Sequence, residues 1–164
     1  MPDHFDHQFG PVAGLTAVLS ATTELRAGAL VFDNDYRHPL VLAKELATID
    51  VLSEGRLEIG LGAGWMVSDY EQSGIVYDRA GVRIDRFEEA LDVIEGLLGD
   101  GPFSHAGEHY TITGHTLHPR PVQRPRPPLV IGGGGPRVLT IAARRADIVG
   151  INGNLRSGVI GSEA

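Results

Sequence analysis

Short apolar segments that fit buried strands alternate along this chain with longer segments whose apolar residues recur every three or four positions. Because the predicted strands are apolar on their buried side, this alternation predicts βαβ units and a parallel sheet covered by helices. The sequence therefore predicts an α/β fold. We expect parallel strands at 25–32, 56–62, 129–132 and 147–151, adjacent in that order, and helices at 12–21, 39–55, 84–98 and 136–145.

One segment, 102–128, interrupts the alternation between the third helix and the third strand. Its first half has the pattern of a β-hairpin that turns at Ala106–Gly107, and its second half is rich in proline. We interpret it as an insertion within one domain, because both flanking parts continue the same alternation. Residues 153–164 have no pattern and are expected to form a disordered tail.

Composition excludes several classes of function. The net charge is −7, which disfavours binding to nucleic acid or to an anionic membrane. The chain has no cysteine, which excludes thiolate metal sites and cysteine nucleophiles. Apolar runs are shorter than a membrane span and the N-terminus lacks a signal pattern, so we expect a cytoplasmic protein without a membrane partner.

A glycine-rich turn, Gly60 to Gly64, closes the second predicted strand. Strand alternation places Gly60 and Gly62 on the face opposite to the apolar side chains of that strand. Two glycines on the inner face would leave a hollow where a flat ring could lie, at the strand end where such folds carry active sites. A glycine-rich turn without a ligand is the alternative.

A second glycine run, Gly132 to Gly135, lies where the third strand meets the helix that begins at Pro136. Free backbone amides and the positive end of a helix favour a phosphate group there, and Arg137 would add charge. A flexible connection is the alternative interpretation. This run lacks the lysine of a Walker loop, which argues against hydrolysis of nucleoside triphosphates.

Histidines are the candidates for proton transfer. Asp3 and His4 place an acid beside a histidine near the N-terminus, although a surface histidine would have the same pattern. His38 precedes Pro39 and is expected to cap a helix. The insertion contains four more histidines, but their spacing does not match a metal site and we expect no bound metal.

Taken together, these motifs resemble the luciferase-like superfamily, and in particular its coenzyme F420-dependent branch. The resemblance implies a (β/α)8 barrel with the cofactor ring over the C-terminal strand ends, and the insertion lying across the barrel's loops. A whole barrel needs on the order of 250 residues, so we expect 1–152 to form a partial barrel. Strand two would be reduced to its last residues, and strands one, seven and eight would be absent. The matching stretches are RHPLVLAKELATIDVLSEGRLEIGLGAGW, RFEEALDVIEGLL and PRPVQRPRPPLVIGGGGPRVLTIAARRADIVGIN.

The resemblance also implies roles for individual residues. His4 would be the catalytic proton partner, and a non-prolyl cis peptide bond would lie near Ala29 and Leu30. Trp65 stands where sugar-phosphate-oxidising members carry a glutamate, which implies a less polar substrate. The implied cofactor-binding residues are Asp3, Ala29, Leu30, Gly62, Gly64, Gly134, Gly135 and Arg137.

The implied function is that of an oxidoreductase, which transfers a hydride between coenzyme F420 and a small organic substrate. A reduced-FMN-dependent monooxygenase of the same superfamily is one alternative. A non-catalytic barrel fragment is another. The sequence leaves the oligomeric state open, and a homodimer is compatible with it.

Overall fold

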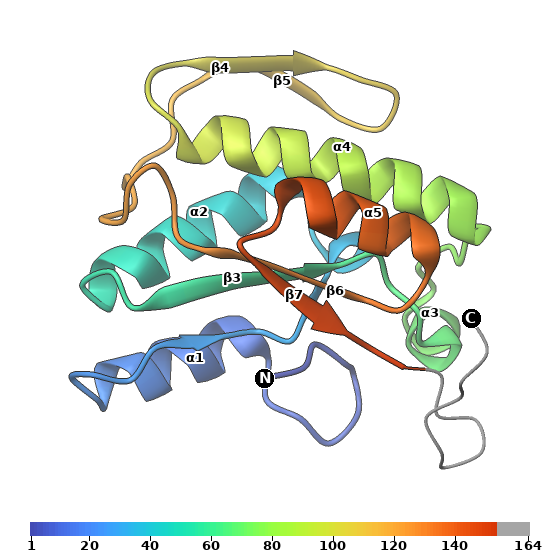
Figure 1. Cartoon of the computed structure of the whole chain (residues 1–164), viewed down its shortest axis with the longest axis horizontal. Helices are drawn as coiled ribbons and strands as arrows, with labels where there is room; N and C mark the ends of the chain where they lie inside the picture. Colours follow the sequence, from blue (N-terminus) through green and yellow to red (C-terminus); the bar gives the residue numbers. More distant parts are fainter. Residues whose placement is uncertain (154–164) are drawn as a thin grey trace.

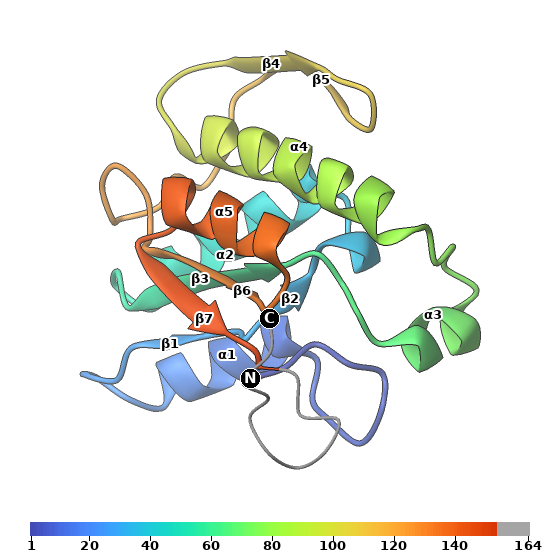
Figure 2. The ribbon, with the colours of Figure 1, turned by 45° about the vertical axis from the view of Figure 1, so that its right-hand side comes forward.

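A parallel β-sheet, curled into half of a barrel, forms the centre of the molecule, and helices cover its outer face (Figures 1 and 2). The computed structural model describes residues 1–153. Neighbouring strands follow the order β1-β3-β6-β7, and β2 also pairs with β3. The predicted order of parallel strands is therefore confirmed. The strands are β1 (Ala27–Gly28), β2 (Phe32–Asp33), β3 (Leu57–Gly62), β6 (Leu129–Gly133) and β7 (Ile148–Ile151).

The first predicted strand, 25–32, is split into β1 and β2. β1 pairs with the first residues of β3, and β2 pairs with its last residues. The Leu30–Val31 peptide bond between them is cis, one bond after the position expected at Ala29–Leu30. A Cβ atom at Gly60 would lie 1.7 Å from the carbonyl oxygen of Ala29, so the close approach of the two chains requires glycine at that position.

Three of the helices begin where the sequence offers a suitable first residue. Proline occupies the first turn of α1, α2 and α5, where no amide donor is needed. His38 caps α2 as predicted, since its Nδ1 accepts a hydrogen bond from the amide of Leu40 at 3.2 Å. α3 was not expected from the sequence, and α4 begins at Ala80 instead of Ile84. The helices are α1 (Pro11–Ser20), α2 (Pro39–Leu52), α3 (Val67–Ser73), α4 (Ala80–Leu98) and α5 (Pro136–Arg145), with a short 3-10 turn at Asn34–Tyr36.

The hydrophobic core lies between the sheet and the helices. The alternating side chains Leu57, Ile59 and Leu61 of β3 are all almost completely buried. They pack in one cluster with the apolar stripes of α2 and α4. Burial of each such side chain contributes about 1.5–3 kcal/mol. This packing fixes the positions of the strand ends that carry the site.

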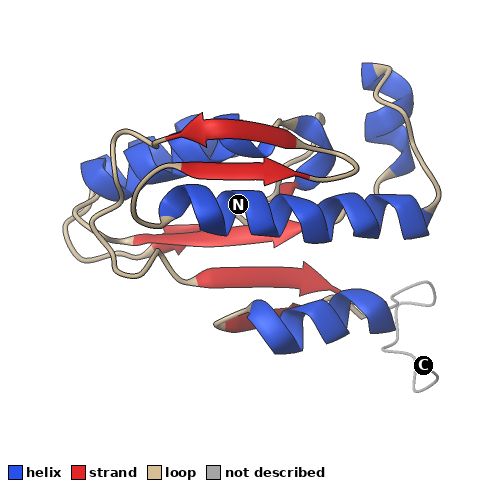
Figure 3. Cartoon of the chain, turned by 90° about the horizontal axis from the view of Figure 1, so that it is seen from above, coloured by secondary structure: helices blue, strands red, loops and turns tan. Residues whose placement is uncertain are grey.

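The insertion folds as the predicted antiparallel hairpin of β4 (Phe103–Ala106) and β5 (Thr111–His115). It lies on the outer side of α4, away from the sheet (Figures 1 and 3). Glu89 of α4 accepts hydrogen bonds from the amides of His109 and Tyr110 at 2.9 and 2.7 Å. The sequence predicted that the insertion lies across the loops at the C-terminal strand ends. This prediction is wrong, because the hairpin covers the outer side of α4 instead.

The two edges of the sheet differ. At β1, the N-terminal amine of Met1 donates to the carbonyl of Gly28 at 3.1 Å, and the Met1 carbonyl accepts from the amide of Leu30 at 2.8 Å. At β7, no strand among residues 1–153 covers the outer edge, and Ile151 is 78% exposed.

Apart from Gly153, the predicted tail lies outside the described residues. No helix in the described part of the chain is long and apolar enough to span a membrane.

Candidate functional site

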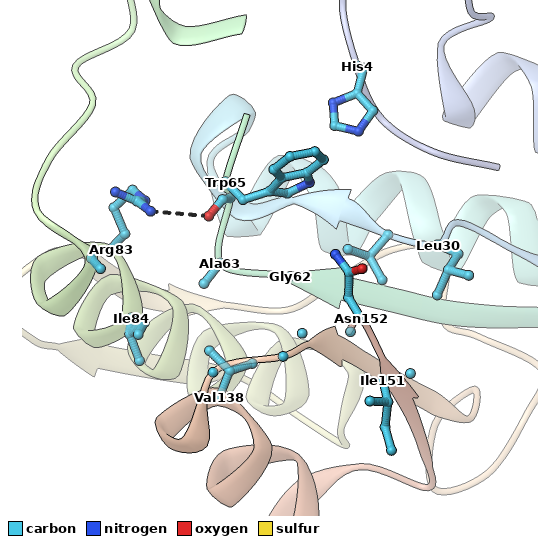
Figure 4. Close-up of a pocket in the computed structure, with 18 residues that line it drawn as sticks. His4, Leu30, Gly62, Ala63, Trp65, Arg83, Ile84, Val138, Ile151 and Asn152 are labelled. Carbon is cyan, nitrogen blue, oxygen red and sulfur yellow. Dashed lines mark hydrogen bonds between the residues drawn. The ribbon is translucent and has the colours of Figure 1, made fainter. Parts of the chain in front are cut away.

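A cavity of about 530 Å³ opens at the C-terminal ends of the strands (Figure 4). In folds of this architecture, active sites lie at this end because the loops after the strands converge there. The strand ends contribute Leu30, Gly62, Gly132 and Gly150 to the wall. The first turns of α4 and α5 contribute Arg83, Ile84 and Val138.

Most of the site residues predicted from the sequence line this one cavity, although they lie far apart in the chain. Those on its wall are His4, Leu30, Gly62, Gly64, Gly134 and Gly135. Asp3, Ala29 and Arg137 do not belong to the wall. The fold therefore brings together the N-terminal histidine and both glycine-rich turns.

Asp3 is buried beside the cavity and is 5% exposed. Its Oδ1 accepts from Nη2 of Arg37 at 3.1 Å, and its Oδ2 accepts from the amide of Asp33 at 3.1 Å. These contacts tie the N-terminal segment to β2. Asp3 thus holds the position of its neighbour His4. Ala29, which is 2% exposed, packs in the core.

Arg137 lies in the first turn of α5, but its guanidinium does not line the cavity. Its guanidinium pairs with Asp85 and lies 3.8 Å from a carboxylate oxygen of Glu88, both on α4. Nearly half of the Arg137 side chain is exposed. The acidic residues Asp85 and Glu88 of α4 therefore neutralise Arg137, which the sequence predicted to bind a phosphate.

His4 is held by a buried carboxylate. Its Nδ1 lies 2.7 Å from Oδ2 of Asp69, and the hydroxyl of Tyr36 donates to the same oxygen at 2.8 Å. Burial opposes ionisation of Asp69, but the hydrogen bonds from His4 and Tyr36 hold its pKa below the ordinary value. Because Nδ1 faces an anion, Nε2 is the ring nitrogen left for the cavity. The ring stands edge-on to Trp65, with centroids 5.8 Å apart (Figure 4).

The sequence analysis missed Asp69 because it missed α3. That helix has seven residues, VSDYEQS, without an apolar stripe at helical spacing. Two weaker signals were available. Gly74 ends the helix in the left-handed conformation typical of a C-terminal glycine, and Asp69 is an acid in the first turn.

The hollow expected over the inward-facing glycines of β3 is partly filled. A Cβ atom at Gly62 would lie 2.5 Å from Cγ2 of Val31, and one at Gly132 would lie 2.8 Å from Cγ1 of the same residue. Val31 thus takes the space nearest the sheet, and the cavity begins beyond it. The strand-end glycines remain as a flat backbone wall.

The second glycine-rich turn has one filled and one open position. A Cβ atom at Gly134 would lie 2.0 Å from the carbonyl oxygen of Asn152, whereas at Gly135 it would meet no atom within 4 Å. Gly135 precedes α5, whose N-terminus has no side-chain cap. Uncapped amides at the positive end of a helix form a cradle that suits an anion.

A buried acid lies behind the first glycine-rich turn. At Gly64, which has φ +74°, a Cβ atom would lie 1.9 Å from the hydroxyl of Tyr70 and within 3 Å of both carboxylate oxygens of Asp33. Burial raises the pKa of Asp33 to about 6, and the charge of Asp35 adds to the shift. Arg86 binds Asp35 at 2.8 Å, which leaves Asp33 without an ion pair among residues 1–153.

Arg83 is a second residue that the sequence analysis missed, because the predicted helix began one residue later. Its side chain lines the cavity and the residue is only 7% exposed. Nη2 donates to the carbonyl of Gly64 at 3.4 Å (Figure 4, dashed line), and Nη1 donates to the carbonyl of Asp78. The guanidinium carbon lies 4.1 Å from the centre of the Tyr77 ring.

Among residues 1–153, no three histidine or acidic side chains are grouped as a metal ion would require. His105 of the insertion instead contacts Glu89 at 3.1 Å.

Comparison with known proteins gives a consistent set of relatives. A family model described as luciferase-like monooxygenase matches residues 1–158. An FMNH2-dependent dimethylsulfone monooxygenase of Pseudomonas putida is 31% identical over 154 residues, which cover 94% of this chain and 42% of the relative. An F420-dependent glucose-6-phosphate dehydrogenase of Amycolatopsis mediterranei is 29% identical over 153 residues, which cover 88% of this chain and 45% of the relative.

A solved structure is also similar. The coenzyme F420-dependent tetrahydromethanopterin reductase from Methanopyrus kandleri superposes with a TM-score of 0.80 at 25% identity. The match covers 92% of this chain and 46% of that one. The chain thus spans about half the length of the relatives that it matches.

Proposed function

Because this chain belongs to the luciferase-like monooxygenase family, we propose that it forms the cofactor-binding half of an oxidoreductase that uses coenzyme F420 with a small organic substrate. The observation that carries this proposal is the single cavity in which His4, Trp65 and both glycine-rich turns meet. Its volume of about 530 Å³ lies within the range typical of small-molecule sites. When bound, the deazaflavin would supply or accept the hydride.

The residues on the cavity wall fit such a cofactor. Leu30 and the backbone of Gly62 and Gly64 offer an apolar, flat surface for a ring. The open position at Gly135 and the uncapped start of α5 offer amides for a phosphate group. Asp3 and Ala29 would act indirectly, by holding the segments that carry His4 and Leu30.

His4 would act as the proton partner. Its Nε2 faces the cavity and would exchange a proton with the substrate, while the carboxylate of Asp69 holds Nδ1. Trp65 is 60% exposed and stands beside His4, which favours a substrate with apolar surface.

A second candidate is a monooxygenase that uses reduced FMN. The relative from Pseudomonas putida favours it, because that protein is FMNH2-dependent and is 31% identical to this chain. The enzymes from Amycolatopsis mediterranei and Methanopyrus kandleri favour coenzyme F420. Both cofactors carry a phosphate and a planar ring, so the same wall would serve either.

Trp65 makes a direct test possible, because it is the only tryptophan of the chain and lines the cavity. Its fluorescence is titrated with coenzyme F420, FMN and riboflavin, with N-acetyl-tryptophanamide as the control for inner-filter quenching. We expect saturable quenching at lower concentrations of F420 than of FMN. Tighter binding of FMN would favour the monooxygenase. Quenching no different from the free indole at millimolar cofactor would contradict a cofactor site on this half-barrel and support a non-catalytic fragment.

A further inference from the structure

Residues 65–78, the α3 loop, leave the strand ends after Gly64 and return close to their own start. The loop carries the short helix α3 and ends just before α4. The guanidinium of Arg83 joins its two ends, because it donates to the carbonyl of Gly64 at 3.4 Å and to the carbonyl of Asp78. Compact loops whose ends lie together in this way are Ω-loops, which frequently carry functional residues.

The α3 loop is attached to the rest of the molecule mainly by polar contacts. It stands apart from the other helices (Figure 2), and among the described residues none from 65–78 belongs to the hydrophobic core cluster. Its apolar side chains Val67 and Val76 are 45% and 70% exposed. The position of the loop beside the cavity therefore depends on a few hydrogen bonds and ion pairs.

Tyr70 makes the most deeply placed of these contacts, since it is only 1% exposed. Its hydroxyl donates to Oδ2 of Asp35 at 3.0 Å and to Oδ1 of Asp33 at 3.3 Å. Burial, and then the charges of Asp33 and Asp35, raise the pKa of Tyr70, so the hydroxyl keeps its proton. A Cβ atom at Gly64 would lie 1.9 Å from the same hydroxyl, which places this contact directly behind the cavity wall.

Two other residues of the α3 loop reach the cavity or the histidine on its wall. Trp65 lines the cavity, and Oδ2 of Asp69 lies 2.7 Å from Nδ1 of His4. Asp69 and Tyr70 are consecutive residues of α3. A displacement of Tyr70 would therefore also displace the carboxylate that holds His4.

We propose that Tyr70 is a positioning residue for His4, because its hydroxyl docks the α3 loop at the strand ends and thereby keeps Asp69 on Nδ1. The value of this arrangement for catalysis rests on the proposed function, in which His4 exchanges a proton with the substrate. The docking itself is a property of the chain without any ligand.

Tyr77 provides the matched control. It belongs to the same loop, but its hydroxyl donates to the carbonyl of Trp65 at 3.3 Å, within the loop itself. Tyr70→Phe and Tyr77→Phe each remove one hydroxyl and keep the aromatic ring. A difference between the two variants therefore reports docking to the strand ends and not the loss of a tyrosine hydroxyl.

The first experiment measures how fast the Nδ1 proton of His4 exchanges with water, by NMR of the 15N-labelled 164-residue chain at a pH where the ring is neutral. We expect Tyr70→Phe to speed this exchange roughly ten- to hundredfold, the range for losing a hydrogen bond to a charged group. Tyr77→Phe should change it less than about threefold. Amide exchange in β3 and β6 should be the same in all three proteins, which shows that the core is intact.

Equal exchange of the His4 proton in Tyr70→Phe and wild type would overturn the proposal. A second measurement needs no variant and decides even if Tyr70→Phe fails to fold. In wild type, the hydroxyl proton of Tyr70 and the Nδ1 proton of His4 should be released by the same opening, so their protection factors should agree within about threefold. A His4 proton that exchanges freely while the Tyr70 hydroxyl stays protected would contradict the docking role.

These outcomes are separate from those of the proposed function, because neither measurement uses a cofactor. A chain that fails to bind coenzyme F420 or FMN but shows the effect of Tyr70→Phe on His4 would contradict the proposed function alone. A chain that binds a cofactor but shows no such effect would contradict the positioning role of Tyr70 alone.

Discussion

Asp69 holds Nδ1 of His4 and thereby determines which ring nitrogen of the neutral histidine carries the proton. Substitution of this one residue tests that role. The carboxylate accepts only, so a neutral His4 must carry its proton on Nδ1. Asp69→Asn offers a donor as well as an acceptor, so we expect it to shift the neutral ring toward the Nε2-protonated tautomer. The measurement is the pair of imidazole 15N chemical shifts in long-range 1H–15N spectra, at a pH where the ring is neutral.

Tyr36→Phe is the control for this prediction. It removes the hydroxyl that donates to Asp69 at 2.8 Å but keeps the carboxylate, so the Nδ1-protonated tautomer should persist. A tautomer that stays the same in Asp69→Asn would show that Asp69 is only structural.

Asp33 is a buried acid whose ionisation should make stability depend on pH. Its pKa is raised from 3.8 to about 6, mainly by burial, so the folded chain binds the proton more tightly than the unfolded chain does. The free energy of unfolding should therefore fall as the pH rises from about 4 through 6. Asp33→Asn removes this loss, and we expect it to stabilise the chain by roughly 1–3 kcal/mol at pH 8.

Urea unfolding of wild type and Asp33→Asn between pH 5 and 8 provides the measurement. The stabilisation by Asn should shrink toward pH 5. A difference that is constant with pH would mean that Asp33 is ionised in the folded chain throughout this range.

At the scale of elements, sequence pattern located the strands that are apolar on both faces and the helices with long stripes. It could not locate the break in 25–32, because residues 27–32 form an uninterrupted apolar run and the break depends on how closely Ala29 approaches Gly60. The start of α4 was missed because no capping side chain marks it. Arg83 and Asp69 were therefore hidden, one before a helix predicted too short and the other within a helix not predicted.

Glu89 fastens the inserted hairpin to α4. Burial opposes its ionisation, but hydrogen bonds from the amides of His109 and Tyr110 hold its pKa below the ordinary value. Glu89→Ala should therefore release the hairpin and raise amide exchange in β4 and β5 by roughly ten- to hundredfold, while β3 and β6 stay protected. Native-state hydrogen exchange measures this.

Glu88→Ala is the matched control, since Glu88 is the preceding residue of α4 and lies toward Arg137 instead of the hairpin. It should leave exchange in the hairpin unchanged. Equal exchange in Glu89→Ala and wild type would contradict the anchoring role.

At the scale of the whole molecule, the described residues form a half-barrel with a cavity at one end. In a closed barrel every strand has two neighbours, whereas β7 has one among residues 1–153. Ile148 and Ile151 on β7 are 43% and 78% exposed, and Leu30 in the cavity wall is 62% exposed. The cavity is therefore open on the β7 side, and we expect this chain alone to hold a cofactor weakly.

The central claim is that the strand-end cavity binds the ring and phosphate of one cofactor. It is tested most directly by titrating the 15N-labelled chain with coenzyme F420 and mapping the amide shifts. We predict weak binding in fast exchange, with shifts confined to the strand-end glycines Gly62 and Gly64, the turn at Gly134 and Gly135, and the indole of Trp65. Shifts that centre on the hairpin or on the outer helices, or none at millimolar cofactor, would contradict it.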